Sequence, residues 1–266
     1  IGGKGGVGTS TVALNLAASL QKAGRQQSVA LVDLDLESDD LALFLDLAAT
    51  RGIRELVQDL SRLDQTILQS MLVKHKSGVQ LLSSGSQEVG EAPPPPGCIL
   101  HTIGLLRLMF GCVVLDCGHR INPSIQEALD LSSRVLVVTT LSVPSIRRAK
   151  RLVQHLQHSV AGRMQVSLVV NRYRSDEVDL LKEAESILKL KASWLIGNDY
   201  RTTSQALDAG VPLVDMSPHA EVSQQYGRQA AALLKEMAPH AVAGSTKELR
   251  KKDSLRSKYW PLFSSG

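Results

Sequence analysis

Residues 3–10 constrain the fold more than any other stretch of this chain. They form the glycine-rich run Gly3-Lys4-Gly5-Gly6-Val7-Gly8-Thr9-Ser10. Gly3, Gly8 and Ser10 match the spacing of a phosphate-binding loop, in which backbone N–H groups turn toward an anion and a hydroxyl reaches Mg²⁺. An ordinary glycine turn before a helix is the alternative. The apolar helix that we expect at residues 10–23 favours the phosphate loop, because its positive end would point at the same anion.

One position in this loop departs from the usual pattern. A lysine normally precedes the final Ser or Thr and reaches the β- and γ-phosphates, but Thr9 stands there in this chain. Lys4, at the second position of the loop, supplies a positive charge from a different place. We therefore expect a phosphate site whose positive charge comes from Lys4, Mg²⁺ and backbone amides.

Two predicted strands end in aspartates. Residues 28–33 and 112–116 are continuous apolar runs, typical of buried parallel strands; Asp33 ends the first run, Asp35 lies two residues later, and Asp116 ends the second. Ligands bind at the carboxyl ends of such strands, and carboxylates there suit Mg²⁺ binding and the positioning of an attacking water. Solvated loops are the alternative, but together with the glycine loop these acids favour a functional site.

Strands and helices alternate along the chain. Further strands are predicted at residues 80–82, 134–140, 165–170 and 194–196, and helical periodicity covers residues 41–75, a segment from about 123, a segment after 140, and residues 203–209 and 219–237. This order predicts an α/β protein with a doubly wound, mostly parallel sheet flanked by helices, as in P-loop NTPases. We expect one domain over residues 1–238 and a basic, disordered tail over residues 239–266. Ile1 stands where a strand should end, so we expect at least the rest of that strand upstream.

Composition narrows the classes of function. Apolar residues make up 43% of the chain, enough for a sizeable core, yet no apolar run is long enough for a membrane-spanning helix. The three cysteines form no Cys-x-x-Cys pair, which favours a reducing cytoplasm over a disulfide or metal framework. Residues 247–258 carry six basic and two acidic side chains and so account for the whole net charge of +4. A neutral body argues against a protein that binds DNA over a broad surface.

These residues together resemble the ParA/MinD superfamily of deviant Walker A ATPases. More narrowly, the chain is similar to the CpaE/TadZ proteins of Flp (tight-adherence) pilus assembly. The stretches that carry the narrower match lie at residues 5–11, 33–36, 41–46, 63–68, 114–120 and 198–213. Thr9 is the discriminating feature, because most ParA and MinD proteins keep a lysine there while threonine is common among CpaE-like sequences.

The resemblance implies ATP and Mg²⁺ as ligands and assigns a role to each site residue. Lys4 would be the signature lysine that reaches the nucleotide of a partner subunit, Asp35 would orient the attacking water, and Asp116 would be the Walker B acid. The implied catalytic residues are Lys4 and Asp35; the implied nucleotide-binding residues are Gly3, Lys4, Gly5, Gly6, Val7, Gly8, Thr9, Ser10, Thr11, Asn171 and Arg172; and the implied metal ligands are Ser10, Asp35 and Asp116.

Departures from the family pattern point to ATP binding with slow hydrolysis or none. Thr9 removes a charge beside the phosphates, and losing one such electrostatic group costs on the order of 10²–10³ in rate. Residues 37–39, Glu-Ser-Asp, stand where relatives have glutamine or an aromatic residue followed by glycine. The geometry of hydrolysis at this segment is therefore expected to differ from that of the relatives.

Three functions stay open. The first is an ATP-bridged homodimer that localises or scaffolds pilus and secretion assembly proteins. The second is an active MinD/ParA-type ATPase that positions division machinery or DNA, and the third is an interaction module that binds no nucleotide. The resemblance implies a cytoplasmic location, with recruitment to the inner membrane or a cell pole. Basic residues followed by Tyr259, Trp260, Leu262 and Phe263 would allow the tail to touch an anionic membrane surface.

Overall fold

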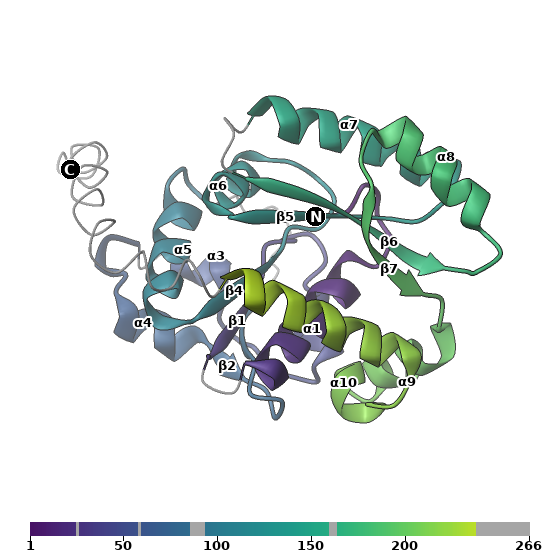
Figure 1. Ribbon diagram of the computed structural model, residues 1–266. Coiled ribbons are helices and arrows are strands. Elements are labelled where there is room, and N and C mark those ends of the chain that lie inside the picture. Colours follow the sequence, from purple (N-terminus) through teal and green to yellow (C-terminus); the bar gives the residue numbers. More distant parts are fainter. Residues whose placement is uncertain (25–26, 58–59, 86–93, 160–163, 238–266) are drawn as a thin grey trace.

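A central sheet with helices on both faces forms the body of the protein (Figure 1). The structure, a computed structural model, describes residues 1–24, 27–57, 60–85, 94–159 and 164–237. The predicted α/β class with a doubly wound, mostly parallel sheet is confirmed. The predicted tail at residues 239–266 lies outside the described residues.

The strands fall into two hydrogen-bonded groups. The first has the order β2 (Val73–Lys74), β3 (Gln80–Leu82), β1 (Val29–Asp33) and β4 (Cys112–Asp116), and the second has the order β5 (Arg134–Thr139), β6 (Gln165–Tyr173) and β7 (Ala192–Gly197). Every pair is parallel except β2 with β3. All five residues of β1 are buried, as expected for a continuous apolar run inside a parallel sheet.

Residues 1–3 join these two groups at the carboxyl edge of the sheet. The amide of Gly2 donates to the carbonyl oxygen of Gly118 (2.7 Å), and the amide of Gly3 donates to that of Val138 (2.9 Å). The amide of Val138 in turn donates to the carbonyl oxygen of Ile1 (3.0 Å). Below this junction a cavity of about 500 Å³ lies between β4 and β5, and the first four residues of β4 are only half-buried there.

Helices cover the sheet on both faces. The helical elements are α1 (Thr9–Ala23), α2 (Asp40–Phe44), α3 (Ile53–Leu56), the 3₁₀ turn η1 (Leu60–Arg62), α4 (Gln65–Met71), α5 (Cys98–Met109), α6 (Pro123–Leu131), α7 (Val143–Ser159), α8 (Val178–Leu188), α9 (Tyr200–Asp208), α10 (Leu213–Met216) and a helix at residues 221–237. Side-chain caps fix several of the starts: the Asn122 carboxamide accepts from the amide of Ile125 at α6, and the Asp199 carboxylate accepts from that of Thr202 at α9.

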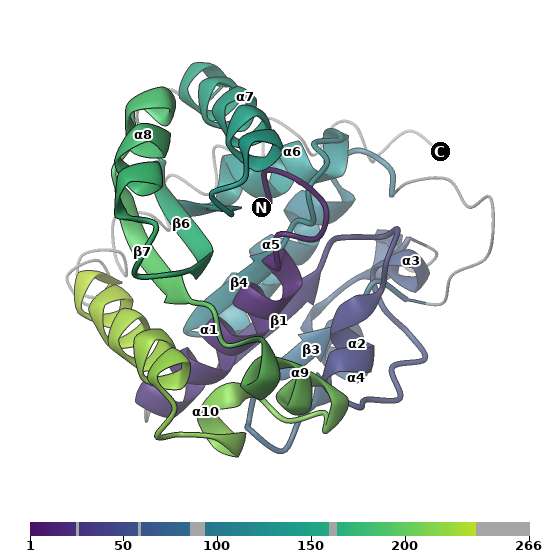
Figure 2. The ribbon, with the colours of Figure 1, turned by 90° about the vertical axis from the view of Figure 1, so that its right-hand side faces the viewer.

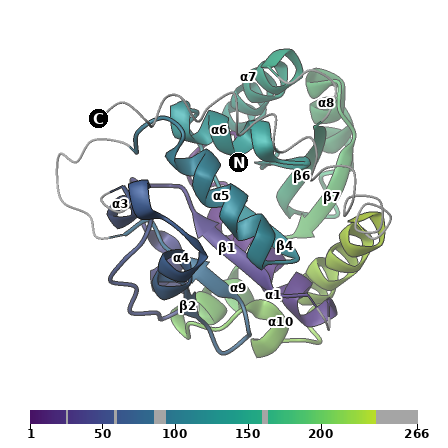
Figure 3. The same cartoon turned by 90° about the vertical axis from the view of Figure 1, so that its left-hand side faces the viewer.

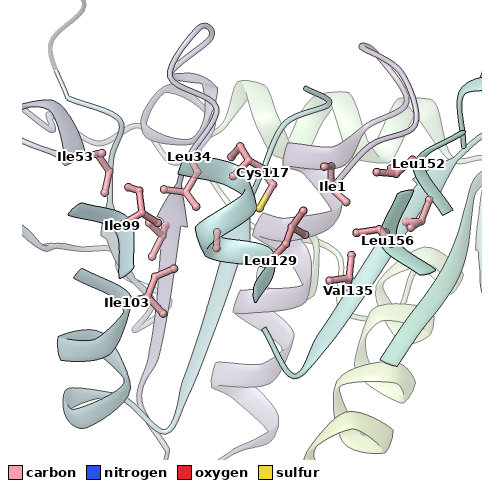
Figure 4. Close-up of a cluster of buried hydrophobic side chains, with 14 of the residues drawn as sticks. Ile1, Leu34, Ile53, Ile99, Ile103, Cys117, Leu129, Val135, Leu152 and Leu156 are labelled. Atoms are coloured by element: carbon pink, nitrogen blue, oxygen red, sulfur yellow. The ribbon is translucent and has the colours of Figure 1, made fainter. Parts of the chain in front are cut away.

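Each face of the sheet has its own aliphatic core. On one face, α4 to α8 bury residues such as Ile103, Leu129 and Leu156 (Figures 3 and 4). On the other face, α1, α9, α10 and the helix at 221–237 bury residues that include Leu14 and Tyr226. Because both faces are covered by apolar packing, the polar ligand site is confined to the edge of the sheet.

Some predicted elements differ from the observed ones. Residues 41–75, expected to be helical, contain three short helices, a 3₁₀ turn and the start of a β-hairpin. Gly52 interrupts the segment because it pairs with Ser83 at the end of β3, where a Cβ on Gly52 would lie 2.3 Å from the Ser83 carbonyl oxygen. Helices α5, α8 and α10 were not predicted. No helix in the part of the chain that the structure describes is both long and apolar enough to cross a membrane.

Candidate functional site at the carboxyl edge of the sheet

The glycine loop turns sharply into α1. Gly6 and Gly8 have positive φ angles of 79° and 89°, a region that a residue with a Cβ rarely adopts. Gly8 is the N-cap of α1 and no side chain caps the helix there, so the first amides of α1 have no side-chain acceptor at this cap. The loop at residues 3–11 therefore leads into an uncapped helix N-terminus, and its role as an anion site stays a prediction.

Asn171, in the carboxyl-terminal part of β6, is hydrogen-bonded to this loop. Its Nδ2 donates to the carbonyl oxygen of Val7 (2.8 Å), and its Oδ1 accepts from the amide of Arg172 (2.9 Å). The loop approaches so closely that a Cβ on Gly8 would lie 2.4 Å from Asn171 Nδ2. The contact of Asn171 with adenine stays a prediction, since in this structure the amide is used by the loop. Arg172 is exposed and adopts a left-handed backbone (φ 58°).

Two buried aspartates lie side by side behind the loop. Asp33 and Asp116 are register partners at the ends of β1 and β4, and both side chains are inaccessible to solvent. Burial, and then the charge of Asp116, raise the pKa of Asp33 to about 8. Burial likewise raises the pKa of Asp116, while the nearby Ser10 side chain acts in the opposite direction. Asp33 was predicted as an acid at the ligand edge of the sheet, but unlike Asp35 and Asp116 it was given no specific role.

The acidic residues fit a Mg²⁺ ion. Asp116 Oδ1 accepts from the amide of Gly118 (3.1 Å), whereas Oδ2 is buried and has no hydrogen-bond partner within the described residues. An unpartnered carboxylate oxygen near a serine hydroxyl is a suitable place for a divalent cation. The described residues hold no cluster of three or more His, Cys, Asp or Glu side chains that would enclose a metal. Mg²⁺ needs none, because one or two carboxylates, waters and substrate phosphates complete its coordination.

Asp35 lies where the segments after β1 and β4 meet. Its backbone amide donates to Asp33 Oδ1 (3.0 Å). A Cβ on Gly118, whose φ is 54°, would lie 2.5 Å from Asp35 Oδ2. Further along, Glu37 forms an exposed ion pair with Arg120 (2.7 Å). The unusual Glu-Ser-Asp segment thus contacts the residues that follow β4, a link for which the sequence carries no local signal.

Lys4 and Thr9 face different surroundings. Lys4 is exposed and makes no hydrogen bond or ion pair within the part of the chain that the structure describes. Thr9 is turned inward: a Cβ on Gly2 would lie 2.3 Å from its Oγ1, and Thr9 also lines the cavity between β4 and β5. His119 lies beside Gly5, whose added Cβ would be 3.4 Å from the imidazole. Lys4 is therefore a cation of the loop that no described residue pairs with.

Comparison with known proteins finds both a family model and individual relatives that match this sequence. The model of the CobQ/CobB/MinD/ParA nucleotide-binding domain matches residues 1–199. The septum site-determining protein MinD of Synechocystis sp. is 26% identical over 216 residues, which covers 80% of this chain and 79% of that protein.

Solved structures agree at the level of the fold. A ParA family ATPase from Chlorobium tepidum superposes with a TM-score of 0.78 at 22% identity, covering 86% of this chain and 96% of that one. MinD from Pyrococcus horikoshii, solved with Mg-ADP, superposes with a TM-score of 0.73 at 19% identity, covering 88% and 93%.

Proposed function

The chain belongs to the CobQ/CobB/MinD/ParA nucleotide-binding domain family, and on that premise we propose that it binds Mg·ATP and works as an ATP-bridged dimer with slow or no hydrolysis. The observation that carries the proposal is the buried Asp116 carboxylate near Ser10, whose Oδ2 has no hydrogen-bond partner within the described residues. These two residues would hold Mg²⁺, which supplies positive charge to the phosphates. The amides of the loop and of α1 would bind the phosphate oxygens.

The exposed surroundings of the loop support dimerisation through this edge of the sheet. The side chain of Lys4 is exposed on the loop. A residue that reaches the nucleotide of a second subunit has to be exposed in this way. Val143 begins α7 directly after β5 and is 64% exposed, and Tyr200 begins α9 directly after β7 and is 76% exposed. Exposed apolar residues at the rim of a ligand site are typical of a protein interface.

We expect slow hydrolysis because of two features of the candidate site, the uncharged Thr9 and the segment that adjoins Asp35. Thr9 faces the cavity and Gly2 and brings no charge to the loop. Asp35 would orient the attacking water, but the adjoining segment is bound through Glu37 to Arg120. We propose that the bound nucleotide acts mainly as a conformational signal.

The decisive experiment measures Mg·ATP binding, turnover and oligomeric state together. Wild type should bind ATP and dimerise with negligible turnover, and Lys4→Ala should lose the dimer while Thr9→Lys gains turnover. A monomeric wild type in saturating Mg·ATP, by light scattering, would contradict the proposed dimer. Absence of nucleotide binding would support the interaction module instead.

The resemblance to CpaE/TadZ proteins suggests the cellular role. We propose that the dimer recruits pilus and secretion assembly proteins at the inner membrane or a cell pole. The similarity to septum site-determining proteins favours a second candidate, an active ATPase that positions the division machinery. A deletion strain separates the two: loss of surface pili with normal septa supports the first, and misplaced septa with normal pili support the second. Rapid turnover that disappears in Asp35→Ala also favours the second.

A further inference from the structure

One face of α7 is strongly basic. The helix contains Arg147, Arg148, Lys150 and Arg151, all exposed, and no acidic residue. His155 and His158 continue the same exposed side toward the end of the helix. From Arg147 to His158 the strip is about 16 Å long at the rise of an α-helix. We call these six residues the α7 basic face.

The four permanent charges of this face are uncompensated. Among the described residues, the Arg and Lys side chains of α7 take part in none of the ion pairs, whereas Lys182, Lys191 and Arg228 elsewhere on the surface each have an acidic partner. The opposite side of α7, which includes Ile146, Ala149 and Val153, packs into the core and fixes the helix. Packing therefore holds four like charges together on a rigid element.

Helix α7 also contacts the candidate nucleotide site, through the side of the helix that lies opposite the α7 basic face. A Cβ on Gly3 would lie 3.0 Å from the backbone nitrogen and from the Cβ of Ala149, so the loop and α7 are in direct contact. Figure 2 shows the N-terminal loop lying beside α7. Arg148 and Lys150 flank the contact residue in the sequence.

We propose that the α7 basic face is a docking surface for an acidic segment of another protein. Three of its four permanent charges are arginines, whose planar guanidinium groups pair with carboxylates in a bidentate manner. A strip of this length matches three turns of a helix or a short extended peptide. Charge complementarity therefore selects an acidic polypeptide, and it does so whether or not the proposed ATP function holds.

The neighbouring helix argues against nucleic acid and membrane as occupants. α8 lies beside α7 (Figures 1 and 2) and carries two exposed acids, Asp179, which pairs with Lys182, and Glu183. A DNA duplex or an anionic bilayer lying across both helices would be repelled by Glu183, which takes part in no ion pair among the described residues. A narrow acidic segment can follow α7 and avoid α8. Glu183 would then act as a boundary that limits which partners fit.

The test uses the full chain and a fluorescein-labelled acidic probe, an alanine-rich helical peptide with glutamates at three- and four-residue spacing. Fluorescence anisotropy at low salt should show binding by wild type and a loss of roughly tenfold or more in Arg147→Glu/Arg151→Glu, since two pairing sites become repulsive. The matched control, Lys74→Glu/Lys76→Glu, changes the net charge equally on exposed residues of the β2 hairpin and should stay within about twofold of wild type. Arg147→Gln/Arg151→Gln should give an intermediate loss.

Other outcomes would overturn the proposal. Equal losses in both charge-reversed variants would mean that the peptide senses net charge only, and no loss in either would place binding elsewhere, for example on residues 247–258, which every variant retains. A 16-base-pair DNA or phosphatidylglycerol vesicles that bind more tightly than the peptide and depend on Arg147 and Arg151 would identify another class of partner. Thermal unfolding of each variant checks that the fold is intact. Failure here with normal ATP binding would remove the docking surface and leave the proposed function standing.

Discussion

The side-chain amide of Asn171 donates a 2.8 Å hydrogen bond to the carbonyl oxygen of Val7, which ties the end of β6 to the middle of the glycine loop. Asn171 is 8% exposed, so this bond is shielded from water. The bond fixes the conformation of the loop, and phosphate binding by the loop should depend on it.

Replacing Asn171 by alanine should loosen the loop. The loss of a buried hydrogen bond that leaves one partner unsatisfied typically costs about 1–3 kcal/mol of unfolding free energy, and we expect a comparable loss in nucleotide affinity. Urea unfolding and ATP titration measure the two effects. Arg172→Ala, at an exposed neighbouring residue, is the control for stability. Unchanged stability and affinity in Asn171→Ala would show that the bond does not hold the loop.

Two glycine-to-alanine substitutions should change the stability of the fold in opposite directions. Gly8→Ala places a Cβ 2.4 Å from Asn171 Nδ2 at a φ of 89°, so it should destabilise the fold by about 1–3 kcal/mol and abolish phosphate binding. Gly104 lies in α5, and a Cβ there meets nothing within 4 Å. Gly104→Ala should stabilise the protein by about 0.5–1 kcal/mol. Thermal unfolding of both variants checks the pair, and the same sign for both would contradict the loop geometry.

His75 should make stability depend on pH. Its Nδ1 is 2.8 Å from Ser77 Oγ and its Nε2 is 3.1 Å from the Gly210 carbonyl oxygen, and burial lowers its pKa. The unfolded chain therefore takes up the proton first. The contribution of His75 is complete above the unfolded pKa of about 6.5 and is lost as the pH falls below it. Melting temperatures across this range should fall more steeply with acid in wild type than in His75→Gln. His219→Gln, at an exposed histidine, should behave like wild type.

The Glu37–Arg120 ion pair should matter more for nucleotide binding than for folding. Both side chains are about two-thirds exposed, so breaking the pair should change the unfolding free energy by less than about 1 kcal/mol. The pair nevertheless joins the segments that follow β1 and β4 at the site. Glu37→Gln and Arg120→Gln should each weaken Mg·ATP binding, and the double variant should be no weaker than either one. Additive losses, or an equal effect from Glu221→Gln at the exposed pair with Arg228, would sink this prediction.

The sequence predicted the parts of the site that depend on local pattern. The glycine spacing and Ser10 were read from the phosphate-loop pattern, and Asp35 and Asp116 from the rule that ligands bind at the carboxyl ends of parallel strands; their roles in binding stay predictions. The contact between Asn171 and Val7 joins residues 164 positions apart and leaves no local signal. Glu37 and Arg120, 83 positions apart, were hidden for the same reason. The helical periodicity of residues 41–75 misled because Gly52 pairs with the distant Ser83.

The junction made by residues 1–3 has a mechanical consequence. The loop that would bind phosphate is continuous with residues 1–3. The amides of Gly2, Gly3 and Val138 form the hydrogen bonds by which residues 1–3 connect the end of β4 to β5. A ligand that immobilises the loop would also hold the two groups of strands together. Separation of the two groups would then require release of the ligand. Hydrogen exchange at Gly3 and Val138 should then slow in parallel when nucleotide is added, and these two amides would report on the integrity of the whole sheet.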